Sequence, residues 1–198
     1  MKSKPIIFID YQHVGKPSPR KVGDRGAGVD IDDDGKIASD EREAYWTRKI
    51  GLVIEDKLIR QGADVIPLSD GWYADRHDRV NEYAKLYRGR RQIYLAMHLN
   101  AGGGDYSAFF YFPNSSSGKE LAEYLSEAIK EHCGIKRNKV WAATPEDWKN
   151  PYYTIKGVGS PIAICCEPIF MDSPKHKHLL SEAGVELISD AFVEALLR

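Results

Sequence analysis

The segment Gln92-Ile-Tyr-Leu-Ala-Met-His98 is a short apolar run bounded by polar residues, which is typical of a strand buried on both faces of a sheet. Runs of the same kind occur at Pro5–Asp10, Asp64–Leu68 and Pro161–Glu167, and a further strand is expected at Ala108–Phe112. Segments with helical periodicity separate them, at Glu43–Gln61, Arg76–Tyr87, Gly118–Cys133 and Pro174–Leu197. This alternation predicts an α/β fold in which a mainly parallel, twisted sheet is flanked by helices on both faces.

The composition indicates one ordinary globular domain spanning residues 1–198, with 42% hydrophobic and 29% charged residues. Lys and Arg total 28 against 29 Asp and Glu, which argues against a nucleic-acid-binding protein. Because no apolar run is long enough for a signal peptide or a membrane span, we expect synthesis in the cytoplasm without stable membrane insertion. We also expect a monomer.

An acidic loop extends from Asp30 to Glu41, with the sequence Asp-Ile-Asp-Asp-Asp-Gly-Lys-Ile-Ala-Ser-Asp-Glu. It matches the EF-hand-like calcium loop, in which carboxylates alternate before a glycine at position 6 and a glutamate closes the site at position 12. The alternative is a solvated acidic turn in which Asp40 caps the next helix. The predicted Ca²⁺ ligands are the side chains of Asp30, Asp32, Asp34 and Glu41 and the backbone carbonyl of Lys36.

Polar side chains follow three of the predicted strands. His13 lies just past the first strand, His98 ends another, and Glu167 ends a third. Because the carboxyl ends of parallel strands share one edge of the sheet, these residues are expected to converge, with Glu43 as a fourth candidate. Two imidazoles and one carboxylate would hold Zn²⁺ with one position open, and the second carboxylate could move a proton. Each histidine alone could instead be structural, and Glu43 stands at capping-box spacing from Asp40.

Four motifs carry a family resemblance. They are Ile9-Asp10-Tyr-Gln-His13-Val-Gly15, the helix and strand from Glu43 to Val65, Ala96-Met-His98-Leu-Asn100-Ala101, and the run from Pro161 through Glu167 to Asp172. In this order they resemble the type-3 family of zinc-dependent N-acetylmuramoyl-L-alanine amidases, which cleave peptidoglycan. The chain departs from the family where Tyr11-Gln12 replaces Pro-Gly and Ile169 replaces Gly, which bears on substrate fit.

The resemblance implies a role for each matching residue. His13, Glu43 and His98 would bind Zn²⁺, Glu167 would act as general base and then general acid, and Asn100 would contact the peptidoglycan substrate. It also implies action at the bacterial cell wall after release, as a phage endolysin or another wall-lytic enzyme. The rival functions are a zinc amidohydrolase or peptidase with another substrate, and a calcium-dependent wall-binding module without catalysis.

Two further expectations concern the neighbourhood of this site. Glu41 and Glu43 would point about 200° apart on one helix, so that calcium bound by the first could position the second for zinc. The long stretch Gly134–Gly159 is expected to be irregular, and His176 and His178 are expected to be solvated. The aromatic residues of that stretch could line a substrate groove or cover the sheet edge; they are Trp141, Trp148, Tyr152 and Tyr153.

Overall fold

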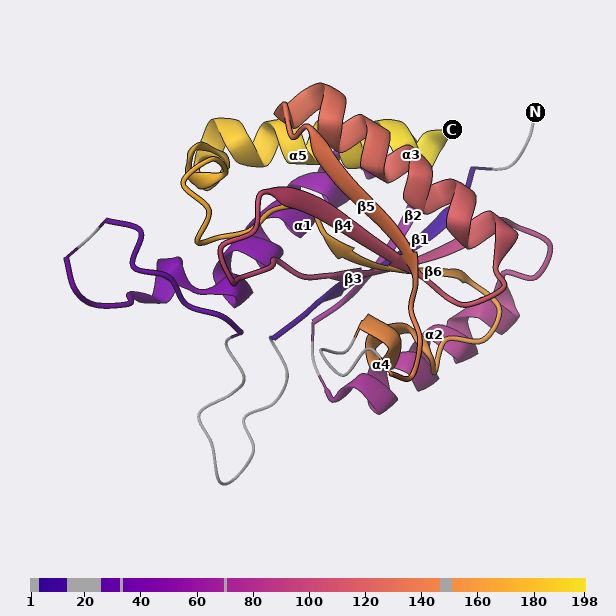
Figure 1. The fold of residues 1–198 in the computed structure, drawn as a ribbon. Helices are drawn as coiled ribbons and strands as arrows, with labels where there is room; N and C mark the ends of the chain where they lie inside the picture. The colour runs from indigo at the N-terminus through magenta and orange to yellow at the C-terminus, as the bar shows by residue number, and fades with distance from the viewer. Residues whose placement is uncertain (1–3, 14–25, 33, 70, 147–150) are drawn as a thin grey trace.

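The computed structural model describes residues 4–13, 26–32, 34–69, 71–146 and 151–198. Within them, six strands form one sheet in the order β2-β1-β3-β6-β4-β5 (Figure 1). β1, β2, β3 and β6 run parallel, β4 is antiparallel to β6, and β5 is parallel to β4. The strands are β1 (Ile6–Tyr11), β2 (Asp64–Leu68), β3 (Gln92–Met97), β4 (Tyr106–Tyr111), β5 (Arg137–Ala142) and β6 (Ile162–Glu167).

Helices cover both faces of this sheet, as Figure 1 shows. One face is covered by α1, α3 and α5, which pack on one another, and α2 and the short α4 lie against the other face. The predicted fold class is therefore confirmed. The helices are α1 (Glu43–Arg60), α2 (Tyr73–Leu86), α3 (Ser116–Cys133), α4 (Pro151–Ile155) and α5 (Glu182–Leu197).

Alternation along the strands divides the core into two layers. All six residues of β1 are buried, with Ile7 and Ile9 in the layer under α1, α3 and α5, and Ile6 and Phe8 in the layer under α2 and α4. Because both faces of the strand are covered, its residues from Ile6 to Ile9 are all apolar instead of alternating with polar residues. The carboxyl ends of β1, β3 and β6, in neighbouring positions, open on one edge of the sheet.

The segment Gly134–Gly159 is more regular than the sequence predicted. It contains β5 and α4, while Trp148 lies outside the described residues. β5 is the last strand of the sheet and remains partly exposed. Its first three residues are polar, and its apolar part is only the three residues 140–142, so no long apolar run marks it.

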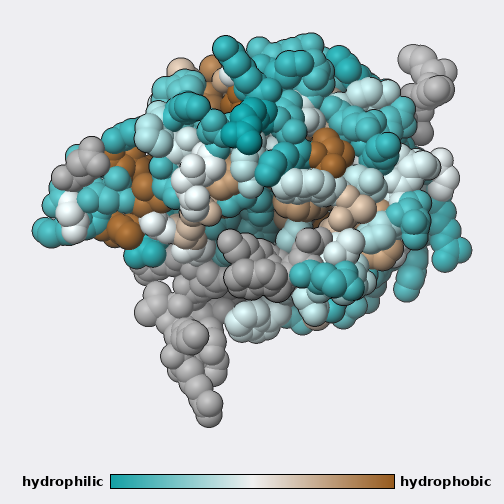
Figure 2. All heavy atoms as spheres, viewed as in Figure 1, coloured by the Kyte–Doolittle hydropathy of each residue, from teal (hydrophilic) through white to brown (hydrophobic). Residues whose placement is uncertain are grey.

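The outer surface in Figure 2 is mainly hydrophilic, with apolar residues grouped over the segment at the left that contains the acidic loop. Ile37, 43% exposed, belongs to that segment. Among the described residues, no helix combines the length and apolar character needed to cross a membrane.

Candidate metal centre and active site

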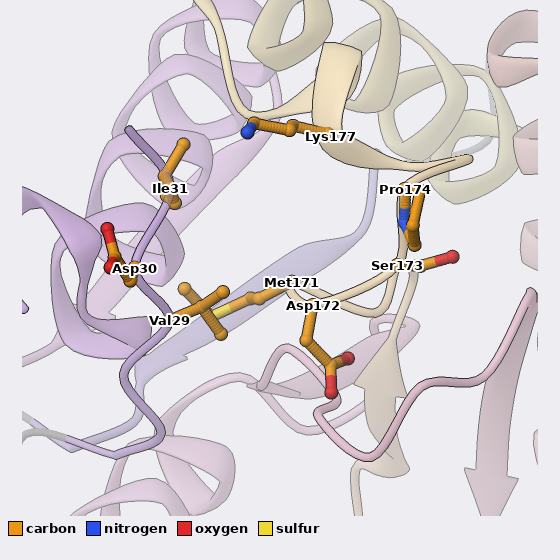
Figure 3. Close-up of a pocket in the computed structure, with 8 residues that line it drawn as sticks. All are labelled: Val29, Asp30, Ile31, Met171, Asp172, Ser173, Pro174 and Lys177. Carbon is orange, nitrogen blue, oxygen red and sulfur yellow. The ribbon is translucent and has the colours of Figure 1, made fainter. Parts of the chain in front are cut away.

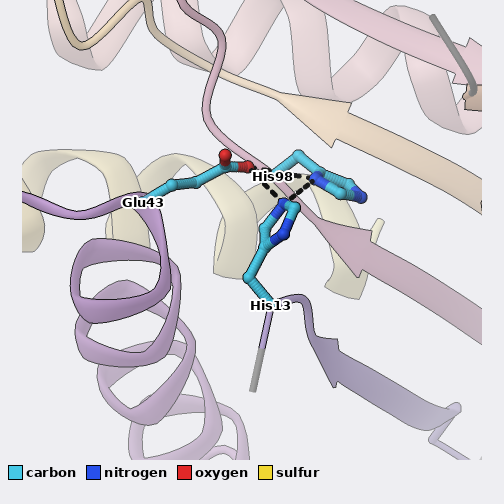
Figure 4. A group of neighbouring side chains, drawn as sticks. All are labelled: His13, Glu43 and His98. Carbon is cyan, nitrogen blue, oxygen red and sulfur yellow. Dashed lines mark hydrogen bonds and ion pairs between the residues drawn. The ribbon is translucent and has the colours of Figure 1, made fainter. Parts of the chain in front are cut away.

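Three side chains from separate elements meet at the carboxyl edge of the sheet (Figure 4). His13 follows β1 after a turn and has a positive φ of 63°, Glu43 is the first residue of α1, and His98 directly follows β3. The His13 Nε2 and His98 Nδ1 atoms each lie 3.0 Å from Glu43 Oε1. The two imidazole nitrogens are 3.0 Å from each other, so the three atoms form a nearly equilateral triangle.

Glu43 is fixed on both oxygens. Its Oε2 accepts a hydrogen bond of 3.0 Å from the Ala27 amide, and its Oε1 accepts one of 3.1 Å from the Leu99 amide. The side chain is buried. Burial alone would raise the pKa of Glu43, but hydrogen bonds and charge from His13 and His98 outweigh it and hold the pKa well below the ordinary value. Glu43 is therefore an anionic ligand group at neutral pH.

The triangle fits a tetrahedral metal ion. Zinc bonds of about 2.0–2.1 Å separate ligand atoms by about 3.3–3.4 Å, slightly more than the 3.0 Å edges here. Two imidazole nitrogens and a carboxylate oxygen aimed at one point are also the donor types that Zn²⁺ takes. The predicted group of His13, Glu43 and His98 is thus brought together in a form that can hold a divalent cation.

Glu167 lies beside this group. Glu167 and the three residues of the group line one cavity of about 320 Å³. The other residues that line it are Ala27, Tyr73, Leu99, Ala101, Pro151, Thr154 and Cys165. The Asn100 side chain donates a hydrogen bond to Glu167 Oε2, and its own oxygen accepts one of 2.8 Å from the Ala101 amide. Asn100 therefore holds Glu167 in place, and the predicted contact between Asn100 and substrate stays a prediction.

A buried charged cluster beneath the site was not predicted from the sequence. Asp10, at 0% exposure, accepts hydrogen bonds from Arg76 Nη1 at 2.7 Å and from the Tyr94 hydroxyl at 2.5 Å. Arg76 also donates to the Tyr11 carbonyl, at 3.3 Å. These bonds fix the end of β1 three residues before His13. The available sequence signal was an Asp closing an apolar strand, but its partner lies 66 positions away.

His176 corrects a second expectation. It is buried and not solvated, and its Nδ1 accepts a 3.0 Å hydrogen bond from the Phe170 amide. Phe170 in turn pairs with Asn100 in an isolated bridge. His176 thus supports the segment behind Asn100 and Glu167.

The acidic loop is tied to the start of α1. The Glu41 carboxylate accepts hydrogen bonds from the amides of Ile31, Asp32 and Ala38, at 2.5, 3.2 and 2.8 Å. Its pKa is lowered, first by the Ala38 amide. Carboxylate oxygens of Asp30, Asp32 and Glu41 lie within 4.8 Å of one another, whereas Asp34 is not part of this group.

The backbone between Glu41 and Glu43 differs from the single helix assumed above. Glu41 ends a short 3₁₀ helix (Ser39–Glu41), and Arg42 is extended, with φ of −102° and ψ of 145°. The two carboxylates do lie in different groups, but this break and not a helical turn separates them.

The loop also borders a cavity of about 300 Å³ between it and segment 171–177. Figure 3 shows the Lys177 side chain crossing toward Ile31 on the loop. The residues that line this cavity are Val29, Asp30, Ile31, Met171, Asp172, Ser173, Pro174 and Lys177.

Comparison with known sequences identifies the family. A sequence profile described as N-acetylmuramoyl-L-alanine amidase matches residues 7–198, nearly the whole chain. The chain belongs to this family. Two histidines and two glutamates of the amidase lie together at one edge of its sheet. Its enzyme class is the one predicted from the sequence. No curated protein sequence matches the chain.

Solved structures share the fold of the amidase. AmiC2 of Nostoc punctiforme has a TM-score of 0.70 at 20% identity, covering 100% of this chain and 97% of that chain. The amidase from Clostridium difficile 630 has a TM-score of 0.72 at 17% identity, covering 98% and 95%. The catalytic domain of the CD27L endolysin targeting Clostridia difficile has a TM-score of 0.66 at 19% identity, covering 98% and 97%.

Proposed function

We propose that this amidase cleaves the bond between N-acetylmuramic acid and L-alanine with Zn²⁺ held by His13, Glu43 and His98. The convergence of these three donors beside Glu167 carries the proposal. When bound, zinc polarises the scissile carbonyl and lowers the pKa of water. The hard anionic oxygen of Glu43 and the two imidazole nitrogens suit this ion.

Glu167 is the proton carrier of the proposed reaction. It lines the same cavity as His13, Glu43 and His98 but does not belong to the group of three that could hold a metal ion. Its carboxylate would take a proton from the attacking water and give it to the departing L-alanine amine. Asn100 donates a hydrogen bond to Oε2 of Glu167 and so holds this carboxylate beside the three proposed ligands.

Two substitutions test the assignment. Glu167→Gln should abolish release of L-alanine amino termini from purified cell wall while zinc content stays at one per chain. His98→Ala should lose both zinc and activity. The matched controls are Glu120→Gln and His132→Ala, two α3 residues outside the cavity, which should keep activity and zinc.

The outcomes separate the rival functions. If Glu167→Gln keeps full effect on the wall, the chain is a binding module and not a catalyst. If the wild type cleaves other peptide amides but releases no L-alanine termini from wall, it is an amidohydrolase with another substrate.

We also propose that the acidic loop binds Ca²⁺ and that binding stabilises the start of α1. Three carboxylates of the loop lie together, and the Val29 amide bonds to the Glu41 carbonyl while the Glu43 amide bonds to the Ala27 carbonyl. Order in the loop is thereby coupled to the position of Glu43. The predicted ligand Asp34 would have to approach the group on binding, because it lies outside it here.

Calorimetry with Ca²⁺ tests the loop. The wild type should show saturable binding below millimolar concentration, and Asp30→Asn with Asp32→Asn should lose it and lower zinc affinity. Asp40→Asn, an exposed acid of the same segment outside the cluster, should bind calcium normally. Loss of calcium binding with unchanged zinc affinity would refute the coupling.

The setting proposed is a wall-lytic enzyme, specifically a phage endolysin acting after release. One of the similar structures is the catalytic domain of an endolysin. Purified protein added to isolated peptidoglycan sacculi should lower their turbidity, and Glu167→Gln should not. To test the endolysin setting, induced expression should lyse cells only when a membrane-permeabilising protein is co-expressed; lysis without one would contradict it.

A further inference from the structure

The sheet carries a lysine in the same row as Glu167. Ala108 of β4 pairs with Glu167 of β6 on one side and with Lys139 of β5 on the other. Directly paired residues point to the same face of a sheet, and neighbouring strands are about 4.8 Å apart. Lys139 therefore projects from the same face as Glu167, with its backbone about 10 Å away. Ala108 is the residue between them in this row.

Two aromatic rings fix the Lys139 ammonium. It lies 3.8 Å from the centroid of the Tyr106 ring and 4.7 Å from that of Trp141. The rings meet edge to face, with centroids 6.4 Å apart, and Trp141 is 40% exposed. The ring faces attract the ammonium charge, but they do not accept hydrogen bonds from its three N–H groups as a carboxylate would.

The charge of Lys139 is not neutralised within the described part of the chain. Arg137, two residues earlier on the same face, pairs with Asp105 at 2.6 Å. No described carboxylate pairs in that way with Lys139. A held ammonium with available donors, on a partly exposed edge strand and in the same cross-strand row as Glu167, is suited to an anionic group of a bound ligand.

The chemistry of peptidoglycan limits which anionic group of the substrate this can be. Its N-acetylated sugars are neutral, and the lactyl carboxyl of muramic acid is consumed in the scissile amide. The anionic groups are the carboxylates of the stem peptide beyond L-alanine. An extended peptide advances about 3.3–3.6 Å per residue, so the second and third stem residues lie about 7–11 Å from the scissile bond. This distance is close to the separation of about 10 Å between the backbones of Lys139 and Glu167.

We propose that Lys139, held by Tyr106 and Trp141, binds a stem-peptide carboxylate and makes the enzyme prefer free-acid stems over amidated ones. The inference rests on the proposed function, because it places the scissile amide over Glu167. It adds a specificity-determining residue on β5, outside the group that performs the reaction.

Two soluble muropeptides test it, identical except that one carries a free stem carboxylate and the other its amide. The wild type should show a kcat/KM at least about tenfold higher on the free acid, the effect of one charge-assisted hydrogen bond, with the difference in KM. Lys139→Met keeps the stem on the rings without the charge, and the ratio should fall toward one. Lys139→Arg should retain the preference, as should the control Lys119→Met on exposed α3 surface.

Each outcome decides one of the proposals. An unchanged ratio in Lys139→Met, or a wild type without preference, overturns the role of Lys139 and leaves the amidase assignment in place. A wild type that cleaves neither muropeptide nor purified wall overturns the proposed function, and the role of Lys139 with it.

Discussion

Removing either charge of the buried Asp10–Arg76 pair should strongly lower the free energy of unfolding of the amidase. Removing both charges together should lower it by less than the sum of the two single effects. Asp10 and Arg76 side chains are 0% and 4% exposed, and their charged atoms are 2.7 Å apart. Burial raises the pKa of Asp10, although Arg76 and the Tyr94 hydroxyl oppose it, so the pair is expensive to desolvate. Asp10→Asn keeps the size of the side chain and leaves the Arg76 charge without its partner.

The magnitude follows from burial. Removing one member of a buried pair costs about 3–5 kcal/mol, because a charge stays in the interior uncompensated. We expect this range for Asp10→Asn and for Arg76→Met. The double variant carries neither charge, so its cost should fall below the sum of the single costs by about 2–3 kcal/mol.

Urea unfolding followed by tryptophan fluorescence measures these values, at one fixed free zinc concentration because bound metal adds to apparent stability. The matched control is Asp64→Asn, whose carboxylate lies 2.5 Å from Arg90 but whose pair is 59% and 27% exposed. It should cost less than about 1 kcal/mol. Single costs that add within about 0.5 kcal/mol, or an Asp10→Asn cost no larger than the control, would refute the reasoning.

Three further predictions concern the surroundings of the site. Asn100→Ala should lower kcat up to about 100-fold with zinc content unchanged, because Glu167 loses the amide that orients it; kinetics and metal analysis measure both, and an unaltered kcat would contradict this. Burial lowers the pKa of His176 below 6.5, so the unfolded chain binds protons more readily than the native one and the unfolding free energy should drop as pH falls below about 6.5. In His176→Asn, which keeps an acceptor for the Phe170 amide, that drop in urea titrations should shrink; an equal drop would show that another group causes it. Gln12→Met should raise the unfolding free energy by about 1 kcal/mol or more, because both polar atoms of buried Gln12 lack a partner among the described residues; a lower urea midpoint would count against it.

The sequence predicted the parts that follow from local pattern and strand direction. His13, His98 and Glu167 converge because β1, β3 and β6 are parallel neighbours, so polar residues at their carboxyl ends share one edge. Glu43 was found by its place at the start of a helix and by the family resemblance. These four residues required no knowledge of side-chain packing.

What the sequence did not predict depends on contacts between distant segments. Arg76 and Asp10 are 66 positions apart, and only the packing of α2 against the sheet joins them. The Lys-His-Lys-His run around His176 is typical of a solvated turn, yet that histidine is buried and accepts a hydrogen bond from the Phe170 amide. β5 was not predicted because this edge strand begins with three polar residues and has only three apolar residues after them.

The sheet order has a consequence for synthesis. β6 lies between β3 and β4, although it is the last strand made, and it carries Glu167. A nascent chain that ends before residue 162 therefore has β3 and β4 without the strand that joins them, and it lacks the proposed proton carrier. The proposed metal ligands are also far apart in the chain, since His13 and His98 are separated by 85 positions. If these roles hold, wall-degrading activity requires the chain to be synthesised through β6.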